Sequence, residues 1–459
     1  MGCTRSLSRI WDNRTKIVFA VFFVSLVAPS AAWAAFASQF SLLVGEGYTD
    51  NVFFSKDKEH DFVTIITPSL TLLYAPEGQT APTLNVNLSP SGNIYARHSE
   101  LNGFGDNMSA TAGYTYQYSP RLNFHISDTF QRQGEGRFTG TGQAADFLSG
   151  PTSPPPTGGV SSRPPSSFLN DFLRRGDELQ NFFGFDGSYL HQPNLSFTAG
   201  YSNSVIKFLD LGGTDTYQTI GGRAVYNWQQ EHNLHAGYSI SIYKPRDDKT
   251  SVIHNFDFGD DYFTNYNIQL TPTLSLTANT GLSFNTSNDG PRVANSTNIT
   301  ITKLWETAVL NVGMTKGLTP SYGVAGISDT TSFFANFTHS LTEKLSTNAN
   351  ATYSFYDTDD VNFQTFRAGL GIQYLFTTWL SSGINYYFNW VKSGSGANST
   401  DLLEKGIVKS NYVFASVTMR FDLWPTTSLA RSMTASSLIP VLRTPFPYQP
   451  PTPAAQPAP

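Results

Sequence analysis

The segment LSTNANATYSFYD, residues 345–357, divides its side chains into two alternating sets. The set that starts at Leu345 is mainly apolar and ends on Tyr353 and Phe355, whereas the residues between are serine, threonine and asparagine. Successive side chains of a β-strand point to opposite faces, so the segment predicts a strand with one apolar and one polar face. The fold class depends on which of these faces meets water.

The same alternation recurs along the chain, in strands of about ten or more residues, against a usual length of roughly five or six. Clear cases are residues 107–118 (NMSATAGYTYQY), 234–243 (LHAGYSISIY) and 274–284 (LSLTANTGLSF). The connections alternate between short turns, such as YSPRL, and longer polar loops, such as SNDGPRVAN. This rhythm predicts an antiparallel meander of about eighteen strands across residues 40–424, with about sixteen as the alternative because residues 299–317 alternate less clearly.

Composition limits the class of protein. Only 14% of the 459 residues are charged, against roughly a quarter in an ordinary globular domain, and the formal net charge is −5. The mean hydropathy of −0.23 does not favour a bundle of membrane helices, and no basic excess points to nucleic acid as a partner. Cys3 is the only cysteine and lies in a segment expected to be removed, so the mature chain is expected to contain no disulfide and no cysteine metal ligand.

Residues 1–34 have the features of a secretory signal peptide. Basic residues precede the apolar run IVFAVFFVSLVA (residues 17–28), and Ala32 and Ala34 flank Trp33 in a small-x-small cleavage pattern. The run of about twelve residues is shorter than the roughly twenty that a membrane helix needs. We therefore expect export and cleavage, with an uncleaved anchor as the alternative.

An apolar face that points outward into lipid explains the strand pattern best. A soluble sandwich would need a bulky aliphatic core, and the short-stranded blades of a β-propeller do not alternate long and short loops. Hydrocarbon cannot satisfy backbone polar groups, so a sheet in a membrane must close on itself. The sequence therefore predicts an all-β fold, a transmembrane antiparallel up-and-down β-barrel over residues 35–424, with aromatic residues such as Trp228 and Trp379 at the membrane boundaries.

Three residues break the strand pattern. Pro68 and Pro90 lie inside the second and third expected strands, where proline predicts a bulge or a distorted rim. Asp128 lies on the apolar phase of its strand, and we expect it near the outer rim or at a bulge.

The first two expected strands carry a motif. GEGYTDNVFF (residues 45–54) and DFVTIITPSLTLLY (residues 61–74) resemble the opening of the β-barrel porin group of outer-membrane proteins, whose members often carry aromatic-x-Asp-Asn and then Asp-x-x-Thr…Thr-Pro-x-Leu. The resemblance implies a Gram-negative outer-membrane location and a barrel shape, and some members resemble components encoded with exopolysaccharide synthesis and export. The chain departs from the usual assembly signal because residues 425–459 follow its last strand. The motif residues are Tyr48, Asp50, Asn51, Asp61 and Pro68.

The inner face is expected to be a mixed, mildly charged wall. Its other residues are mostly small hydroxyl and amide residues, which suit neutral, hydroxyl-rich solutes, although water would suit them too. We therefore predict a porin-like channel for the passive passage of solutes or secreted polysaccharide. The alternatives are a non-conducting structural or adhesive surface barrel and, third, a barrel hydrolase. The charged or titratable residues on the inward phase are Asp186, Arg223, His235, Arg367, Arg420 and Asp422.

Signals for catalysis are weak. His125 and Ser127 share the polar phase of one strand, which is an ordinary arrangement for an interior wall. The chain shows no cysteine–histidine metal spacing, nucleophile elbow or phosphate loop, so we expect no enzyme activity, no cofactor and no metal site. The expected partners are outer-membrane lipid and lipopolysaccharide, the barrel-assembly machinery and polysaccharide export components, and no nucleic acid.

Two segments fall outside the strand rhythm. Residues 134–177, rich in proline, glycine and serine, predict a disordered outer loop, with an inward-folded constriction as the alternative. Residues 425–459 predict a flexible, Pro-rich periplasmic tail, either inert or docked to a partner through SSLIPVLRTPFPY.

Overall fold

The computed structural model describes the strands and most of the turns of the chain. The expected signal peptide (residues 1–34), nearly all of the loop 134–177 and the tail 425–459 lie outside the described residues, so the expectations for them stay predictions. The described residues are 36–74, 84–133, 177–209, 212–229, 232–246, 250–264, 273–287, 290–320, 327–357, 362–393 and 406–424.

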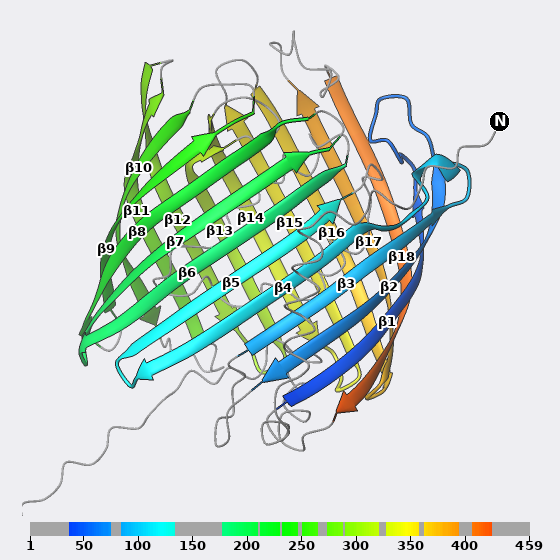
Figure 1. Cartoon of the computed structure of the whole chain (residues 1–459), viewed down its shortest axis with the longest axis horizontal. Coiled ribbons are helices and arrows are strands. Elements are labelled where there is room, and N and C mark those ends of the chain that lie inside the picture. Colours follow the sequence, from blue (N-terminus) through cyan, green and yellow to red (C-terminus); the bar gives the residue numbers. More distant parts are fainter. Residues whose placement is uncertain are drawn as a thin grey trace, which may run out of the picture.

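Eighteen antiparallel strands form one sheet, in which each strand pairs with its neighbours in sequence. The first strand also pairs with the last, so the sheet closes into a barrel whose strands run obliquely around it (Figure 1). The predicted fold class and the count of eighteen strands are confirmed. The strands are β1 (Phe36–Thr49), β2 (Asp61–Tyr74), β3 (Leu84–Tyr95), β4 (Gly103–Ser119), β5 (Leu122–Gln133), β6 (Glu178–Gln192), β7 (Leu195–Phe208), β8 (Thr214–Gln229), β9 (His232–Lys244), β10 (Ser251–Thr264), β11 (Thr273–Ser287), β12 (Gly290–Leu304), β13 (Ala308–Pro320), β14 (Ile327–Ser340), β15 (Leu345–Asp357), β16 (Asn362–Thr377), β17 (Leu380–Ser393) and β18 (Gly406–Trp424).

The two ends of the barrel differ in their connections. At the short-turn end, residues 120–121 join β4 to β5 and residues 378–379 join β16 to β17. At the long-loop end, residues 50–60 join β1 to β2, and a 3-10 helix, η3 (Ser99–Leu101), lies between β3 and β4. Ser38 pairs with Trp424, so the barrel begins and finishes at the short-turn end.

Burial identifies the inner face of the sheet. In β2, Val63 and Ile65 are buried, whereas Phe62, on the opposite face of the strand, is exposed. Similarly, in β15 Ser354 is buried and Phe355 is exposed. Side chains on the outer face of a closed barrel have no protein packed over them, so the buried set is the inner set. The polar phase of residues 345–357 therefore points inward, as the sequence predicts.

Aromatic side chains occupy part of the inner face near the long-loop end. Tyr412 lies 6.0 Å, between ring centroids, from both Tyr387 and Phe414. Val52 from the first long loop and Tyr95 from β3 pack in the same buried cluster. The expectation that the residues of the inner phase, apart from a few charged ones, are mostly small and polar is therefore wrong at this end, where a long loop covers the wall and allows apolar area to be buried.

Two glycines of β1 make room for these rings. A Cβ atom at Gly47 would lie 2.5 Å from the Tyr412 hydroxyl oxygen, and one at Gly45 would overlap the ring of Phe414. Because β1 has no side chains at these inner positions, the rings from β18 can lie flat against the wall at the seam where the barrel closes.

A second buried cluster lies at the same end of the barrel, on strands β7 to β14. It does not involve the first long loop, and it confirms that interior apolar packing is a general feature of this end. Its members are Ile206, Phe208, Tyr243, Ile253, Ala294, Leu318 and Ile327.

Pro68 and Pro90 lie where the ladder between β2 and β3 is interrupted. The predicted bulge occurs beside Pro90, where the register between β3 and β4 shifts between Ser91 and Gly92. Backbone pairing stops at Ile66 and resumes at Leu70. Hydroxyl groups bridge the gap on the inner face: Thr67 bonds to Ser91 at 3.0 Å, and Ser69 bonds to Ser89 at 2.7 Å. These side-chain bonds link the two strands where proline cannot donate to the ladder.

The wall is less complete between β12 and β13. These strands pair only over residues 297–304 and 309–316. Toward the long-loop end, β12 continues to pair with β11, and β13 with β14. The weakly alternating segment of the sequence does form two strands, but they separate from each other at this end.

Polar pairs lie on the outer face a few residues below the long-loop end. Asn181 donates a hydrogen bond of 2.7 Å to Asp128, and Thr64 donates one of 2.7 Å to Glu46. Asp128 therefore belongs to a polar band near this rim. The alternative expectation of a bulge there is wrong, because β5 pairs regularly with β4 and β6 around Asp128.

Candidate functional site

An ion pair spans three strands of the inner wall. Arg223 of β8, Gly237 of β9 and Asp257 of β10 lie side by side in register. The Arg223 guanidinium reaches across β9 and donates two hydrogen bonds to Oδ2 of Asp257, from Nε at 3.0 Å and from Nη2 at 2.6 Å. The two side chains are 26% and 32% exposed, so the pair lies at the surface of the interior.

Gly237 makes this ion pair possible. A Cβ atom there would overlap an oxygen of the Asp257 carboxylate and would come within 3.1 Å of its carbon. Any side chain at this position would therefore push the carboxylate away from Arg223. The ion pair lies along the wall instead of projecting from it because the residue between its two members, Gly237 of β9, has no side chain.

His235 lies behind the ion pair. Its side chain is only 1% exposed, and its Nε2 is 4.0 Å from Oδ2 of Asp257. A Cβ atom at Gly259 would come 2.7 Å from Cε1 of His235, so this ring also lies over a glycine of the neighbouring strand. The Asp257 carboxylate thus lies between a guanidinium and an imidazole.

Two of these three residues were among the predicted interior residues. Arg223 and His235 were expected on the inner wall, and the structure brings them together through Asp257, which was missed. A usable signal existed, because Asp257 shares its phase with Asn255 and Gly259, between the aromatic residues of the other phase.

The other expected interior residues are distributed around the wall. Asp186 of β6 is directly opposite His125 of β5 in register. His125 Nδ1 and the Thr115 hydroxyl are 3.1 Å apart, so this histidine is hydrogen-bonded to a threonine of β4. Ser127 is opposite Gly184, and the arrangement offers no base aligned with a nucleophile.

Arg367, Arg420 and Asp422 form no common cluster with Arg223. The Arg367 guanidinium carbon lies 5.9 Å from the ring centroid of Tyr387, beside the interior aromatic cluster. Asp422, near the short-turn end of β18, accepts a hydrogen bond of 3.0 Å from Gln39 of β1, and Arg420 is opposite Ser41. The charges are therefore scattered instead of forming a ring of one sign. That these six residues line a transport path stays a prediction.

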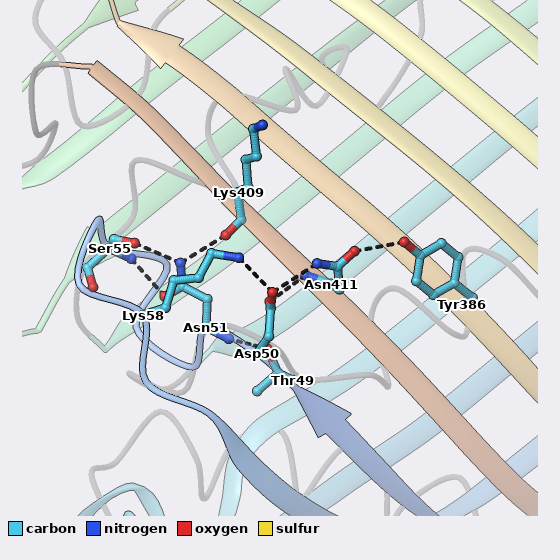
Figure 2. A network of polar contacts seen from close by, with 8 residues as sticks. All are labelled: Thr49, Asp50, Asn51, Ser55, Lys58, Tyr386, Lys409 and Asn411. Atoms are coloured by element: carbon cyan, nitrogen blue, oxygen red, sulfur yellow. Dashed lines mark hydrogen bonds and ion pairs between the residues drawn. The ribbon is translucent and has the colours of Figure 1, made fainter.

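The motif residues Asp50 and Asn51 anchor the first long loop to the last strand (Figure 2). The Asn51 amide donates to the backbone carbonyls of Ser55, at 2.7 Å, and Lys409, at 3.0 Å. Its Oδ1 accepts a hydrogen bond of 3.0 Å from the Ser55 backbone. One fully buried side chain thus closes the loop on itself and ties it to β18.

Asp50 holds β18 through Asn411. Its carboxylate accepts hydrogen bonds from the backbone N–H of Asn411 at 2.6 Å, from the Asn411 amide at 2.8 Å and from Lys58 at 2.6 Å. Tyr386 of β17 extends this network by donating to Oδ1 of Asn411 at 2.7 Å (Figure 2). Burial raises the pKa of Asp50, but the hydrogen bonds from Asn411 and Lys58 outweigh it, and the pKa lies below its ordinary value.

The remaining motif residues are also architectural. The buried Asp61 carboxylate accepts hydrogen bonds of 3.0 Å from the backbone N–H groups of Arg97 and His98, which fixes the turn after β3. Tyr48 packs against Phe62 on the outer face, with the two rings tilted and their centroids 5.0 Å apart. Together with Pro68, these residues shape the closing seam and the adjacent loops and do not form a reaction centre.

Neither a metal cluster nor a membrane helix is found in the described part of the chain. No group of three or more histidine, cysteine, aspartate or glutamate side chains there could hold a metal ion. Among the same residues, no helix has the length and apolarity required to cross a membrane.

The chain shows low similarity to several solved structures. No family model and no curated protein matches the chain. Similar solved structures include the outer membrane protein opdK from Pseudomonas aeruginosa, at 12% identity and TM-score 0.43, covering 84% of this chain and 99% of that chain. OccK2 (OpdF) of the same organism in complex with glucuronate has 9% identity, TM-score 0.44 and coverages of 84% and 98%. OccAB4 of Acinetobacter baumannii has 9% identity, TM-score 0.46 and coverages of 86% and 100%. At such low similarity these structures carry no argument about this chain.

Proposed function

We propose that this chain is a porin-like channel of the Gram-negative outer membrane. The observation that carries the proposal is the opposite polarity of the two faces of a closed barrel. Apolar side chains such as Leu276, Leu370 and Ile384 are exposed on the outer face. The inner face of the same strands carries mainly serine, threonine, asparagine and glycine, apart from the interior aromatic cluster at the long-loop end. Hydrocarbon accepts such a sheet only when it is closed and apolar outside.

Aromatic residues near the short turns support the membrane location. Trp228, Trp305 and Trp379 are all exposed at the short-turn end. The Lys303 ammonium lies 5.2 Å from the ring centroid of Trp305, as expected where lysine extends along a ring toward the headgroups. In the proposed orientation, this end is periplasmic and the chain reaches the membrane by signal-peptide export and the barrel-assembly machinery, with lipid and lipopolysaccharide around the barrel.

The proposed activity is passive passage of hydrophilic solutes or secreted polysaccharide, without catalysis. The scattered, mutually compensating charges of the inner wall support a channel with weak charge preference. Polysaccharide export components are the proposed partners if the cargo is polysaccharide, and loss of surface polysaccharide on deletion of the gene is the expected phenotype.

One observation favours a second candidate, a non-conducting structural or adhesive barrel. Val52 of the first loop is buried in an interior aromatic cluster that includes Tyr387 and Tyr412. Interior packing of this kind reduces the free cross-section at the long-loop end. A barrel closed there would be a scaffold for its loops.

Planar-bilayer recording separates the two candidates. The purified chain, shown to be a folded barrel by heat-modifiable gel mobility, is expected to give steady ohmic current steps, and liposomes containing it are expected to swell in neutral sugars. Folded, inserted protein that remains electrically silent and does not support swelling would overturn the channel and favour the scaffold.

A further inference from the structure

We propose that the inner wall of β8–β11 is a binding subsite for neutral, hydroxyl-rich solutes, centred on Arg223 and Asp257. The subsite rests on the proposed function, because it names the class of solute that the interior accepts. The centre of the subsite is the ion pair between Arg223 and Asp257. Their side chains are one-quarter to one-third exposed to the interior and lie flat across Gly237.

The pair offers hydrogen bonds without offering a net charge. Both bonds from Arg223 go to Oδ2 of Asp257, and among the described residues no side chain donates to Oδ1. This oxygen can accept a hydrogen bond from a solute hydroxyl, while the remaining N–H groups of the guanidinium can donate one. An anionic solute would have to displace Asp257 from Arg223, and a cationic solute would have to displace Arg223 from Asp257. Either exchange separates a close ion pair, so a neutral solute is favoured.

Amide and hydroxyl groups extend the subsite along the wall. Asn255 is two residues from Asp257 on the same face, and Ser239 and Ser283 flank it in register. Ser283 donates a hydrogen bond of 2.5 Å to Oδ1 of Asn255, which orients the amide and leaves its N–H groups to donate to a ligand. Each sugar hydroxyl both donates and accepts, so a surface with interleaved donors and acceptors matches it.

The glycines under these side chains make the surface flat. Besides Gly237, Gly281 lies next to Asp257 in register, and a Cβ atom there would overlap the backbone of Phe256. The wall therefore presents a shallow polar strip instead of a pocket. Such a strip can contact successive sugar units as a chain moves along it, without holding any of them tightly.

Isothermal titration of the detergent-solubilised barrel tests the subsite directly. The probes are a neutral glucose hexasaccharide and a uronic acid oligosaccharide of the same length. Wild type is expected to bind the neutral probe more tightly than the uronate. R223A/D257A is expected to lose about tenfold in affinity for the neutral probe, and D257N, which leaves Arg223 uncompensated, is expected to reverse the preference toward the uronate.

A matched ion pair on the outer face is the control. Arg132 and Asp177 are 2.9 Å apart with side chains 28% and 24% exposed, and Arg132 is in register with outward-facing Met108 and Leu179. R132A/D177A is expected to bind both probes like wild type. If R223A/D257A does not fold, N255A removes only the amide and is expected to weaken neutral binding about threefold.

The results separate this inference from the channel itself, because titration needs no current. A silent barrel that binds the neutral probe through Arg223 and Asp257 would keep the subsite and remove the channel. The subsite is overturned if wild type fails to bind the neutral probe, prefers the uronate, or binds no better than R223A/D257A.

Discussion

At Gly237 the absence of a side chain decides whether Arg223 can reach Asp257. The geometry is local: three residues in register on β8, β9 and β10, with the middle one a glycine. Glycine is usually unfavourable inside a strand. Here the unfavourable free energy of a glycine in a strand is offset by an ion pair that a larger residue would break. The net effect of Gly237 on stability therefore depends on its neighbours Arg223 and Asp257.

Gly237→Ala is expected to destabilise the barrel by about 1 kcal/mol relative to the control below, because the added methyl group displaces the partly exposed Asp257 carboxylate from Arg223. Equilibrium urea unfolding of the barrel in liposomes measures this. Gly317→Ala is the control, since the nearest atom to a Cβ there is 3.7 Å away, and it is expected to be neutral or stabilising. Equal stability of the two variants would contradict the role assigned to Gly237.

Asp50 gives a pH-dependent test of the seam between β1 and β18. Its pKa in the folded barrel is below the ordinary value of 3.8, so its stabilising contribution is complete above about pH 4 and is lost as the pH falls through the folded-state pKa. Asp50→Asn is therefore expected to be less stable than wild type at pH 7, with the difference shrinking below pH 3.8. Unfolding midpoints of both proteins, measured between about pH 2 and pH 8, are expected to converge at the acid end of this range.

The control for this series is Glu343→Gln, an exposed carboxylate in the turn after β14. It is expected to follow the wild-type pH curve throughout. A difference between Asp50→Asn and wild type that stays constant from neutral to acid pH would mean that the carboxylate charge does not stabilise the seam.

At the scale of elements, two pairs of strands lose backbone pairing over several residues, in different ways. Between β2 and β3, proline removes ladder bonds and hydroxyl groups on the inner face restore a connection. Between β12 and β13, by contrast, the strands separate at the long-loop end. The first departure follows from residue type, whereas the second is visible only in the pairing of the strands.

Ser69→Ala/Ser89→Ala is expected to lower the free energy of unfolding by roughly 1 kcal/mol, the usual net value of one hydrogen bond. The same change at Ser332 and Ser354, which are also 2.7 Å apart but lie between regularly paired strands, serves as the control. It is expected to cost less, because the backbone ladder there is intact. Urea unfolding of both double variants gives the comparison, and a larger loss at Ser332 and Ser354 would contradict the bridging role.

The β12–β13 gap is expected to show in hydrogen exchange. Peptides covering residues 290–296 and 317–320 should exchange faster than those covering residues 297–304 and 309–316, since part of their backbone N–H groups lacks a partner across the gap. Mass spectrometry of the barrel in micelles measures the rates. Uniform protection along both strands would show that the gap is closed in solution.

At the scale of the whole molecule, closure is the central feature, because it joins the first and last strands of the barrel. β1 meets β18 over residues 38–49, and the Asp50–Asn411 contacts link residues 361 positions apart. Contacts so distant in sequence form late and carry a large loop-closure cost. The motif at the start of the barrel supports closure by supplying polar anchors at the seam.

Truncation after Trp424 is expected to leave closure intact, because the last strand pairs with both of its neighbours within the retained residues. The truncated chain should show the same heat-modifiable gel mobility and the same conductance as the full chain. Failure to fold or insert would make residues 425–459 part of the barrel, and an increase in conductance would assign them to the interior.

The sequence alone predicted the features that repeat locally. Alternation with period two identified the strands and their faces, and alternating connection lengths identified the two ends. Position alone marked Pro68 and Pro90 as sites of distortion. These signals suffice because each depends on residues that are near neighbours in the chain.

Only the tertiary structure decided which inner residues meet. Phase placed Arg223 and His235 on the inner wall, but their common partner Asp257 depends on the register of three strands and on glycine between them. In the same way, the alternation of side chains along each strand could not predict that Tyr387, Tyr412 and Val52 pack together near the long-loop end of the barrel. Such contacts join residues far apart in sequence, and they exist only because the sheet curves and closes, bringing inner side chains together that no local pattern connects.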